Sequence, residues 1–348
     1  MKFGRVPLSR AQGHILGHNV SREGRRVLKK GRRLGEAELA EIHSAGLDSV
    51  YVAELEASDV GEDVAAQRIG TALAERSGLK LVPAYGGRAS LAAPARGVLS
   101  IRSERLLELN LIPGVTLATP ANHELLREGD SAGTLKIIPF ALSAGSLAAA
   151  LQLVEQGVLE FRALQARRVA ILVSGAAGRR ERLLESFRRP LEQRVTELGS
   201  TLVSVDYVPF DHQPERQMAT ALERQASAGS EIVIVVGETA TMDADDLIPQ
   251  AIRRAGGQVS VVGAPVFPGN LLLLGYREQM AILGAPGCAR SRAQNVVDLL
   301  LPRLLTGERP GPREIAELGL GGLLDRGRAP RGEQGGADNG AGHGESDG

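Results

Sequence analysis

Short apolar runs alternate with amphipathic segments through the second half of the chain. Runs rich in β-branched residues, typical of strands buried on both faces, lie at Val169–Val173 and Ile232–Val236. Segments with helical periodicity follow at Arg180–Leu198 and Leu247–Ala255. This alternation predicts an α/β fold, with a three-layer, doubly wound, mostly parallel sheet in the C-terminal part.

Two later apolar runs lie too close together for a crossover helix. They span Leu271–Leu274 and Gln279–Leu283 and are joined by the short segment Gly275–Glu278. This spacing predicts a β-hairpin, and therefore an antiparallel edge on the sheet. The segment Ser291–Leu305 is expected to close the domain as a helix.

The first half of the chain has a different pattern. Helical spacing predicts helices at Glu36–Ala45 and Asp59–Ser77, the second capped by Ser58 or Asp59. Short alternating segments divided by Gly, Pro and Asn fill Leu79–Pro139 and predict a β-rich module. We therefore expect an N-terminal α+β domain over residues 1–162, with the β-rich module at about 79–140.

The α/β pattern is confined to residues 163–308, which we expect to form the second domain. From Gly307 onward the composition turns to Gly, Arg, Pro and Glu, with few apolar residues. A segment of this kind cannot bury enough apolar surface to fold alone, so residues 309–348 are expected to be a disordered tail.

Composition narrows the classes of function. The formal net charge of +0, the aromatic content of 3% and the absence of Trp argue against nucleic-acid binding through bulk charge or base stacking. A single cysteine, Cys288, excludes an internal disulfide and a multi-thiolate zinc site. No apolar stretch is long enough to span a membrane and no signal peptide is evident, so a cytoplasmic protein is expected.

Two histidines near the start of the chain form a weak metal candidate. Helical spacing over Pro7–Val20 would place His14 and His18, four residues apart, on one helix face. A zinc site needs at least three protein ligands and no third lies nearby, so an ordinary surface role is the better interpretation.

The strongest candidate for chemistry follows the strand Ile232–Val236. The strand ends at Gly237, and a short loop leads to three carboxylates, Asp243, Asp245 and Asp246. Ligands of open α/β sheets bind at the carboxyl ends of strands, and carboxylates suit a hard cation. The alternative is helix capping, with Asp245 or Asp246 as N-cap and the others favourable near the helix dipole.

Two further loops join a strand to a helix. Ser174–Gly178 could present backbone N–H groups to an anion, although it lacks the Gly-Lys-Ser/Thr of a P-loop and is as often a plain tight turn. In Gly284–Ser291, Arg290 could bind a phosphate and Ser291 could cap the helix or bind the ligand. Cys288 would be reactive if the helix N-terminus lowered its pKa, and otherwise packs in the turn.

Three segments together resemble a known family. They are Val236–Ala240 followed by Asp243, Asp246 and Pro249, then Pro268–Asn270, then Gly284–Gly287. Their order and spacing over about Arg167–Leu305 are similar to the molybdopterin-binding domain of molybdopterin adenylyltransferases and molybdotransferases. Stretches of the N-terminal half resemble molybdopterin-binding proteins that accompany cofactor nucleotidyltransferases: Gly86–Leu91, Thr116–Thr119 and Lys136–Phe140.

The chain also departs from that family's pattern. Glu238 stands where the loop has its second glycine, Ala240 where it has a last Gly or Ser, and Asn270 where it has a lysine. Ser174–Gly178 lacks the acidic segment of the molybdotransferases, and no sequence for their terminal β-barrel follows Gly307. The resemblance therefore favours binding over catalysis.

The resemblance implies a ligand and a set of site residues. Molybdopterin, or the finished molybdenum cofactor, would lie across the strand ends, and Mg²⁺ would be held by Asp243 and Asp246. The residues implied to bind the cofactor are Gly237, Glu238, Thr239, Ala240, Thr241, Pro268, Gly269, Asn270, Pro286, Gly287, Cys288, Arg290 and Ser291.

Three functions remain open from the sequence. The first is a molybdopterin-binding protein in molybdenum cofactor biosynthesis or delivery, passing its ligand to a nucleotidyltransferase or a molybdoenzyme. The second is a Mg²⁺-dependent molybdopterin molybdotransferase, in which Asp243 and Asp246 are catalytic. The third is an interaction module with a degenerate pocket. The family likeness also suggests a homo-oligomer.

Overall fold

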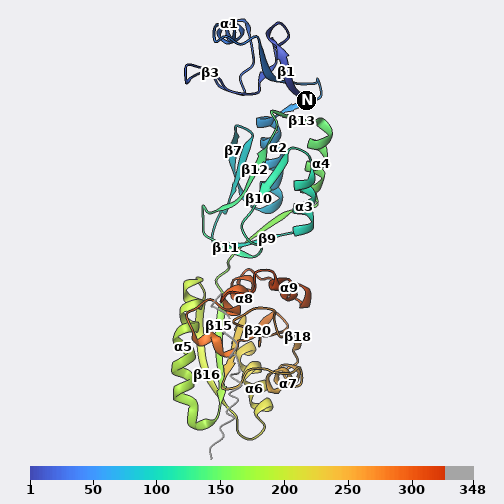
Figure 1. Ribbon diagram of the computed structural model, residues 1–348. Helices are drawn as coiled ribbons and strands as arrows, with labels where there is room; N and C mark the ends of the chain where they lie inside the picture. The colour runs from blue at the N-terminus through green and yellow to red at the C-terminus, as the bar shows by residue number, and fades with distance from the viewer. Residues whose placement is uncertain (326–348) are drawn as a thin grey trace, which may run out of the picture.

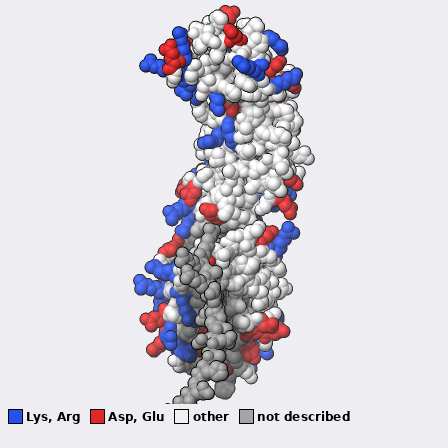
Figure 2. Space-filling model, viewed as in Figure 1, with Lys and Arg blue, Asp and Glu red and all other residues white. Residues whose placement is uncertain are grey.

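Three lobes follow one another along the long axis of the molecule in the computed structural model, which describes residues 1–325 (Figure 1). Separate hydrophobic clusters form the interiors of the N-terminal lobe and the middle lobe. The N-terminal 162 residues, expected as one domain, therefore contain two cores. Charged side chains are prominent on the N-terminal and C-terminal lobes on the face in Figure 2, whereas the right-hand side of the middle lobe is largely uncharged.

The N-terminal lobe is built on a three-stranded sheet of order β1-β5-β2, beside a small hairpin and one helix. Its elements are β1 (Lys2–Pro7), β2 (Ile15–Leu16), β3 (Val20–Arg22), β4 (Arg25–Leu28), α1 (Glu36–Ser44) and β5 (Ser49–Glu54). The helix expected from the pattern over Pro7–Val20 was wrong. Gly13 has a positive φ of 81° and Ile15 and Leu16 pair with β5, so His14 and His18 share no helix face.

The middle lobe confirms the β-rich pattern, with helices packed on two small sheets of order β10-β12-β8-β7 and β11-β9-β14. Its helices are α2 (Glu62–Ser77), α3 (Ser103–Leu111) and α4 (Ala144–Glu155). Its strands are β6 (Val60–Gly61), β7 (Lys80–Tyr85), β8 (Arg88–Ala92), β9 (Gly97–Ile101), β10 (Val115–Ala118), β11 (Glu124–Leu126), β12 (Ser131–Ile137), β13 (Ala141–Leu142) and β14 (Leu159–Ala163).

Helix α2 begins three residues later than its pattern predicted. Val60 and Gly61 pair with β13, so these two residues belong to a ladder and not to the helix. Asp59, expected as one of two possible caps, instead forms an ion pair with the α-amino group of Met1, with an N–O distance of 2.7 Å. The ion pair holds the pKa of the Asp59 carboxyl below its usual value.

The C-terminal lobe contains one six-stranded sheet of order β16-β15-β17-β20-β19-β18. The strands are β15 (Arg168–Gly175), β16 (Thr201–Pro209), β17 (Ile232–Gly237), β18 (Gln258–Val262), β19 (Leu273–Arg277) and β20 (Met280–Gly284). The four strands β16, β15, β17 and β20 run parallel, and β19 pairs antiparallel with both β20 and β18. The predicted hairpin is therefore confirmed as β19 and β20, but its turn is at Glu278–Gln279 and not at Gly275–Glu278. The antiparallel edge expected from this hairpin is wrong, because β18 pairs with β19 and forms the edge.

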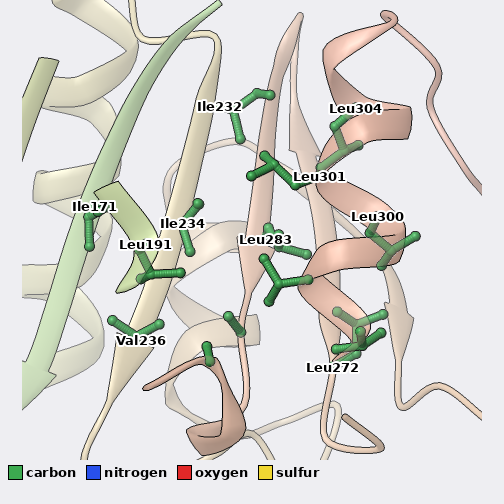
Figure 3. Close-up of a cluster of buried hydrophobic side chains, with 14 of the residues drawn as sticks. Ile171, Leu191, Ile232, Ile234, Val236, Leu272, Leu283, Leu300, Leu301 and Leu304 are labelled. Carbon is green, nitrogen blue, oxygen red and sulfur yellow. The ribbon is translucent and has the colours of Figure 1, made fainter. Parts of the chain in front are cut away.

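Helices cover both faces of this sheet. Alternate residues of β15 and β17, such as Ile171 and Ile234, pack on α5 (Arg180–Glu197) and α8 (Val296–Leu305) (Figure 3). The residues between them, such as Leu172 and Val233, face α6 (Pro214–Ser227) and α7 (Leu247–Arg254). Burial on both faces explains why these strands carry continuous apolar runs.

The segment after Gly307 differs from the expected disorder as far as the structure describes it. Residues 312–316 form α9 (Pro312–Ala316), and Ile315 is 1% exposed within the core of the C-terminal lobe. The helix has 5 residues and Ile315 is its one buried side chain, which is too weak a pattern to predict a helix from the sequence. The rest of the expected tail, 326–348, lies outside the described residues. Within residues 1–325, no helix has the length and apolar character needed to cross a membrane.

An ion pair fixes the end of α8. The Arg303 guanidinium is 0% exposed, and its Nε donates to the Glu308 carboxylate at 2.9 Å. Burial by itself would raise the pKa of the Glu308 carboxyl, but hydrogen bonds from Arg303 outweigh burial and hold that pKa below its usual value. The pair therefore stabilises the lobe above the ordinary carboxyl pKa, and this contribution is lost as the pH falls through the lowered pKa.

We expect Glu308→Gln to lower the free energy of unfolding at pH 7 by about 3 kcal/mol, because it leaves a buried guanidinium without its counter-charge. Urea denaturation followed by circular dichroism at pH 7 and pH 4 measures this, and the difference from wild type should shrink at pH 4. Glu317→Gln is the matched control, since Glu317 pairs with Arg313 at an exposed site. Equal effects of the two substitutions would contradict the prediction.

Candidate functional site

The three loops singled out in the C-terminal lobe lie at one edge of the sheet. They follow β15, β17 and β20, which are neighbouring parallel strands. Ser174 pairs with Gly237 and Val235 pairs with Gly284 in the strand register, so the three strands end near one another at one edge, with β20 ending two residues before β17. The fold thus brings the loops together at the carboxyl ends of the strands, where α/β proteins bind ligands.

A small pocket opens at this edge. Its lining includes Ser174, Gly237, Thr241 and Asp246, together with Gly284 from the third strand. The space that a water-sized molecule could occupy is ≈ 20 Å³, which is room for about one water. A larger ligand would therefore lie across the mouth and place only a small group inside.

The Ser174 hydroxyl stands out within the pocket. Ser174 is 2% exposed, and its Oγ is the one buried side-chain polar atom without a hydrogen-bond partner among the residues described. A buried hydroxyl without a partner costs about 1–3 kcal/mol, so it marks a place where a bound group would be stabilised. The sequence pattern drew attention to the backbone of this loop and missed the hydroxyl, because Ser174 was assigned to the loop, whereas β15 continues to Gly175 and buries it.

Glu238, which follows β17, binds groups in and just after the first loop, Ser174–Gly178. Its Oε2 accepts the backbone N–H of Ala176 at 3.0 Å, and its Oε1 pairs with the Arg179 guanidinium at 2.9 Å. The Tyr207 hydroxyl donates to the Ala176 carbonyl at 2.6 Å, and burial together with the Glu238 charge raises the pKa of Tyr207. The carboxylate thus occupies the N–H group and the guanidinium that an anion would use. Arg179 and Tyr207 were not expected from the sequence.

The aspartates after the second loop act as caps in this structure. Asp246 accepts the backbone N–H of Leu247 at 2.7 Å through Oδ1 and that of Met242 at 3.0 Å through Oδ2. Asp243 accepts the N–H of Asp245 at 2.8 Å, and Asp245 pairs with Arg253. Within residues 1–325 no three His, Cys, Asp or Glu side chains gather in a geometry suited to a metal ion. The capping alternative therefore describes the observed contacts.

The third loop is shaped differently from its prediction. It forms the 3₁₀ helix η3 (Gly287–Arg290), and α8 starts only at Val296, where Asn295 caps it through a bond to the Val297 N–H. Ser291, expected as a possible cap, accepts the N–H of Ala293 at 3.0 Å instead. Asn295 forms a capping box with Asp298, which a pattern of apolar spacing alone did not reveal.

Two candidate side chains in this loop, Arg290 and Cys288, pack against the protein and do not line the pocket. The Arg290 guanidinium lies over the Phe187 ring at 4.6 Å, a cation–π contact. Burial raises the pKa of the Cys288 thiol, so the helix terminus does not activate it. Cys288 fits the packing alternative better than the reactive one.

Arg194 of α5 holds this loop in place. Its guanidinium binds Asp298 through Nε at 2.8 Å and Nη2 at 3.1 Å. The same group donates to the carbonyl oxygens of Ala289 at 3.2 Å and Ser291 at 2.8 Å. The turn that follows β20 is therefore fixed by a side chain from the helix layer.

Not every candidate residue reaches the pocket. Gly237, Thr239, Ala240 and Thr241 line it, whereas the third loop contributes its first residues, Gly284 and Ala285. The turn Pro268–Asn270 does not belong to the lining; Asn270 donates to the Ala264 carbonyl at 3.4 Å. Gly269, with φ of 135°, leaves no room for a Cβ beside Val296, which explains the glycine there.

Comparisons with known proteins give a partial picture. Residues 5–54 match the family model of a domain of unknown function (DUF8806). No curated protein matches the chain. The molybdopterin biosynthesis enzyme MoaB from Thermus thermophilus is 17% identical, with 41% of this chain and 98% of that chain covered and a TM-score of 0.29.

Two further solved structures are similar. The molybdopterin biosynthesis MoeA protein from Pyrococcus horikoshii is 14% identical, covers 90% of this chain and 76% of its own, and has a TM-score of 0.29. A molybdenum cofactor biosynthesis protein B is 16% identical, with 42% and 96% covered and a TM-score of 0.30. These superpositions assign no function to the chain, whose own loops carry the proposal made below.

We expect Arg194→Lys to loosen the third loop, because a single ammonium cannot replace the guanidinium's contacts with Asp298 and the loop carbonyls. Amide hydrogen exchange of residues 287–294 should become about tenfold faster while the strands stay protected. Arg188→Lys on the same helix is the control, since Arg188 is in an exposed pair with Glu192. Unchanged exchange in Arg194→Lys would show that the loop is held by other contacts.

Proposed function

We propose that this chain binds molybdopterin, or the molybdenum-loaded cofactor, and acts in molybdenum cofactor biosynthesis or delivery. The observation that carries the proposal is the buried, unpartnered Ser174 hydroxyl, which lines a pocket at the strand ends. The second and third loops, which resemble the molybdopterin-binding family, contribute to that same pocket. The mixed sheet with helices on both faces supports interpreting residues 163–308 as a doubly wound domain of this kind.

The size of the pocket suggests how the ligand is placed. Room for about one water admits an oxygen atom and excludes a pterin ring. The ring system would lie across the mouth, over Thr239–Thr241, and a polar atom of the ligand would meet Ser174 Oγ. Exposed backbone N–H groups of the second loop would receive the phosphate, as at other strand-to-helix loops.

Binding without turnover fits the site better than molybdate insertion. Asp243 and Asp246 serve as caps that accept backbone N–H groups, and no group of three metal-ligating side chains gathers within residues 1–325. We therefore assign no step to a metal ion. The proposed role is that of a carrier, which would hand its ligand to a nucleotidyltransferase or a molybdoenzyme and could work as a homo-oligomer in the cytoplasm.

An interaction module with a degenerate pocket is the second candidate, and Glu238 favours it. The Glu238 carboxylate already satisfies Ala176 N–H and Arg179 without any ligand. A loop whose anion-binding groups are already satisfied by a side chain of the protein can persist without binding anything.

Titration with molybdopterin and with the molybdenum-loaded cofactor, with and without Mg²⁺, tests the proposal. We expect binding that is indifferent to Mg²⁺ and unchanged by Asp243→Ala, and about five- to tenfold weaker in Ser174→Ala, since one hydrogen bond is lost. Ser200→Ala is the matched control, because that buried hydroxyl accepts the Arg167 N–H at the other end of β15.

The remaining outcomes of this titration discriminate between the candidates. Mg²⁺-dependent binding that is lost in Asp243→Ala and in Asp246→Asn would favour the molybdotransferase instead; Asn at 246 retains a capping oxygen. No binding of either pterin would reject the carrier and leave the interaction module.

Glu238→Gln should strengthen the binding of a small anion at the first loop. It removes the negative charge that repels the anion and that competes for Arg179, while one amide oxygen can still accept the Ala176 N–H. We expect the affinity for inorganic pyrophosphate, measured by calorimetry, to rise about tenfold, which corresponds to about 1.4 kcal/mol. Glu181→Gln, at an exposed position of α5, should leave it unchanged. Equal affinities of Glu238→Gln and wild type would show that Glu238 does not block an anion-binding site at the first loop.

A further inference from the structure

A second cavity lies far from the strand ends, between the N-terminal lobe and the middle lobe. It has a volume of ≈ 720 Å³, within the range of small-molecule sites. The N-terminal lobe contributes Phe3, Gly17, His18 and Lys30, and the middle lobe contributes residues 113–114 and 138–143 with Ser146. In Figure 1 this region lies around the N-terminus, β13 and the start of α4.

Aromatic rings are concentrated here in a chain that has few of them. The sequence holds six Phe, four Tyr and no Trp. Phe3 and Phe140 line the cavity, and Tyr51 stacks on Phe3 at 6.0 Å and lies 4.7 Å from the His18 ring. Phe3 is 49% exposed and Tyr51 is 43% exposed. Such half-exposed stacked rings offer a surface on which a planar ligand can bury apolar area.

The cavity lining contains basic residues and no carboxylate side chain. No Asp or Glu belongs to it, whereas Lys30, His18 and Met1 do. The Met1 α-amino group is neutralised by Asp59 at 2.7 Å. Within residues 1–325, Lys30 and His18 have no ion pair with a carboxylate. The cavity therefore favours a ligand that carries negative charge.

Backbone contacts preform the cavity. A Cβ at Gly17 would lie 2.7 Å from the Phe3 ring, so glycine lets that ring pack flat against the chain. The carbonyl of Phe140 accepts the Glu62 N–H at 2.9 Å, and the Phe140 ring faces Gly31 of the N-terminal lobe. The Phe140 ring beside Gly31 and the ion pair of Met1 with Asp59 bring residues of both lobes around one space.

We propose that this cavity binds a planar heteroaromatic ring that carries a phosphate group, with the ring on Phe3 and His18, which Tyr51 supports from outside the lining, and the phosphate near Lys30. The proposal is independent of the strand-end site, because the two sites share no residue. Two sources have this chemistry, a mononucleotide and a phosphorylated pterin, and separate arms of the experiment distinguish them.

The experiment is calorimetric titration of the full chain with GMP, CMP and AMP, with molybdopterin, and with guanosine and inorganic phosphate as fragments. We expect at least one phosphorylated heterocycle to bind more tightly than either fragment. Lys30→Gln should weaken that binding at least fivefold, whereas Lys29→Gln, the neighbouring exposed lysine outside the lining, should not change it.

The aromatic contribution has its own matched pair. Phe3→Leu should weaken the binding at least threefold, whereas Tyr85→Leu, at an exposed ring elsewhere in the middle lobe, should have no effect. Ser174→Ala should leave nucleotide binding intact, which separates this site from the proposed carrier site. Failure of every phosphorylated heterocycle to bind, or equal binding by Lys30→Gln and wild type, would overturn the proposal.

Discussion

The turn that follows β20 depends on the Arg194 guanidinium. It reaches from α5 and donates to the backbone carbonyls of Ala289, Ser291 and Ala293, of which the Ala289 contact is buried. Through Asp298 it also reaches the capping box that starts α8. One side chain thus joins a helix layer, a loop and the helix that covers the sheet. β17 and β20 keep their mutual position through their own pairing, and Arg194 fixes the turn that follows β20.

Two neighbouring polar groups at that edge are in opposite situations. The Ser174 hydroxyl is buried without a partner, which costs stability, while Glu238 satisfies an N–H group and a guanidinium that would otherwise lack an anion. A ligand that hydrogen-bonds to the Ser174 hydroxyl would gain binding free energy directly. To place an anion on Arg179, the same ligand would have to displace the Glu238 carboxylate. Whether the hydrogen bond to Ser174 outweighs the cost of displacing Glu238 decides between a carrier and an interaction module with a degenerate pocket.

The N-terminal lobe and the middle lobe have separate cores, and their contact leaves a cavity rather than a packed interface. Glycine at position 17 allows the Phe3 ring to approach the backbone closely there, since a Cβ would lie 2.7 Å from it. The chain has an aromatic content of only 3%, yet several of its rings lie at this one cavity. The proposed second site and the strand-end site would let the chain hold two anionic ligands in different lobes.

The sequence by itself determined the strands and helices of the C-terminal lobe, because burial on both faces of a parallel sheet imposes apolar runs that can be read locally. It also placed the three loops at strand ends. Helix starts were less well predicted: α2 and α8 begin late because pairing with β13 and the Asn295 capping box decide them. Only the tertiary structure joined Glu238 to Ala176, 62 residues away, and left Ser174 without a partner, because such contacts depend on which strands become neighbours.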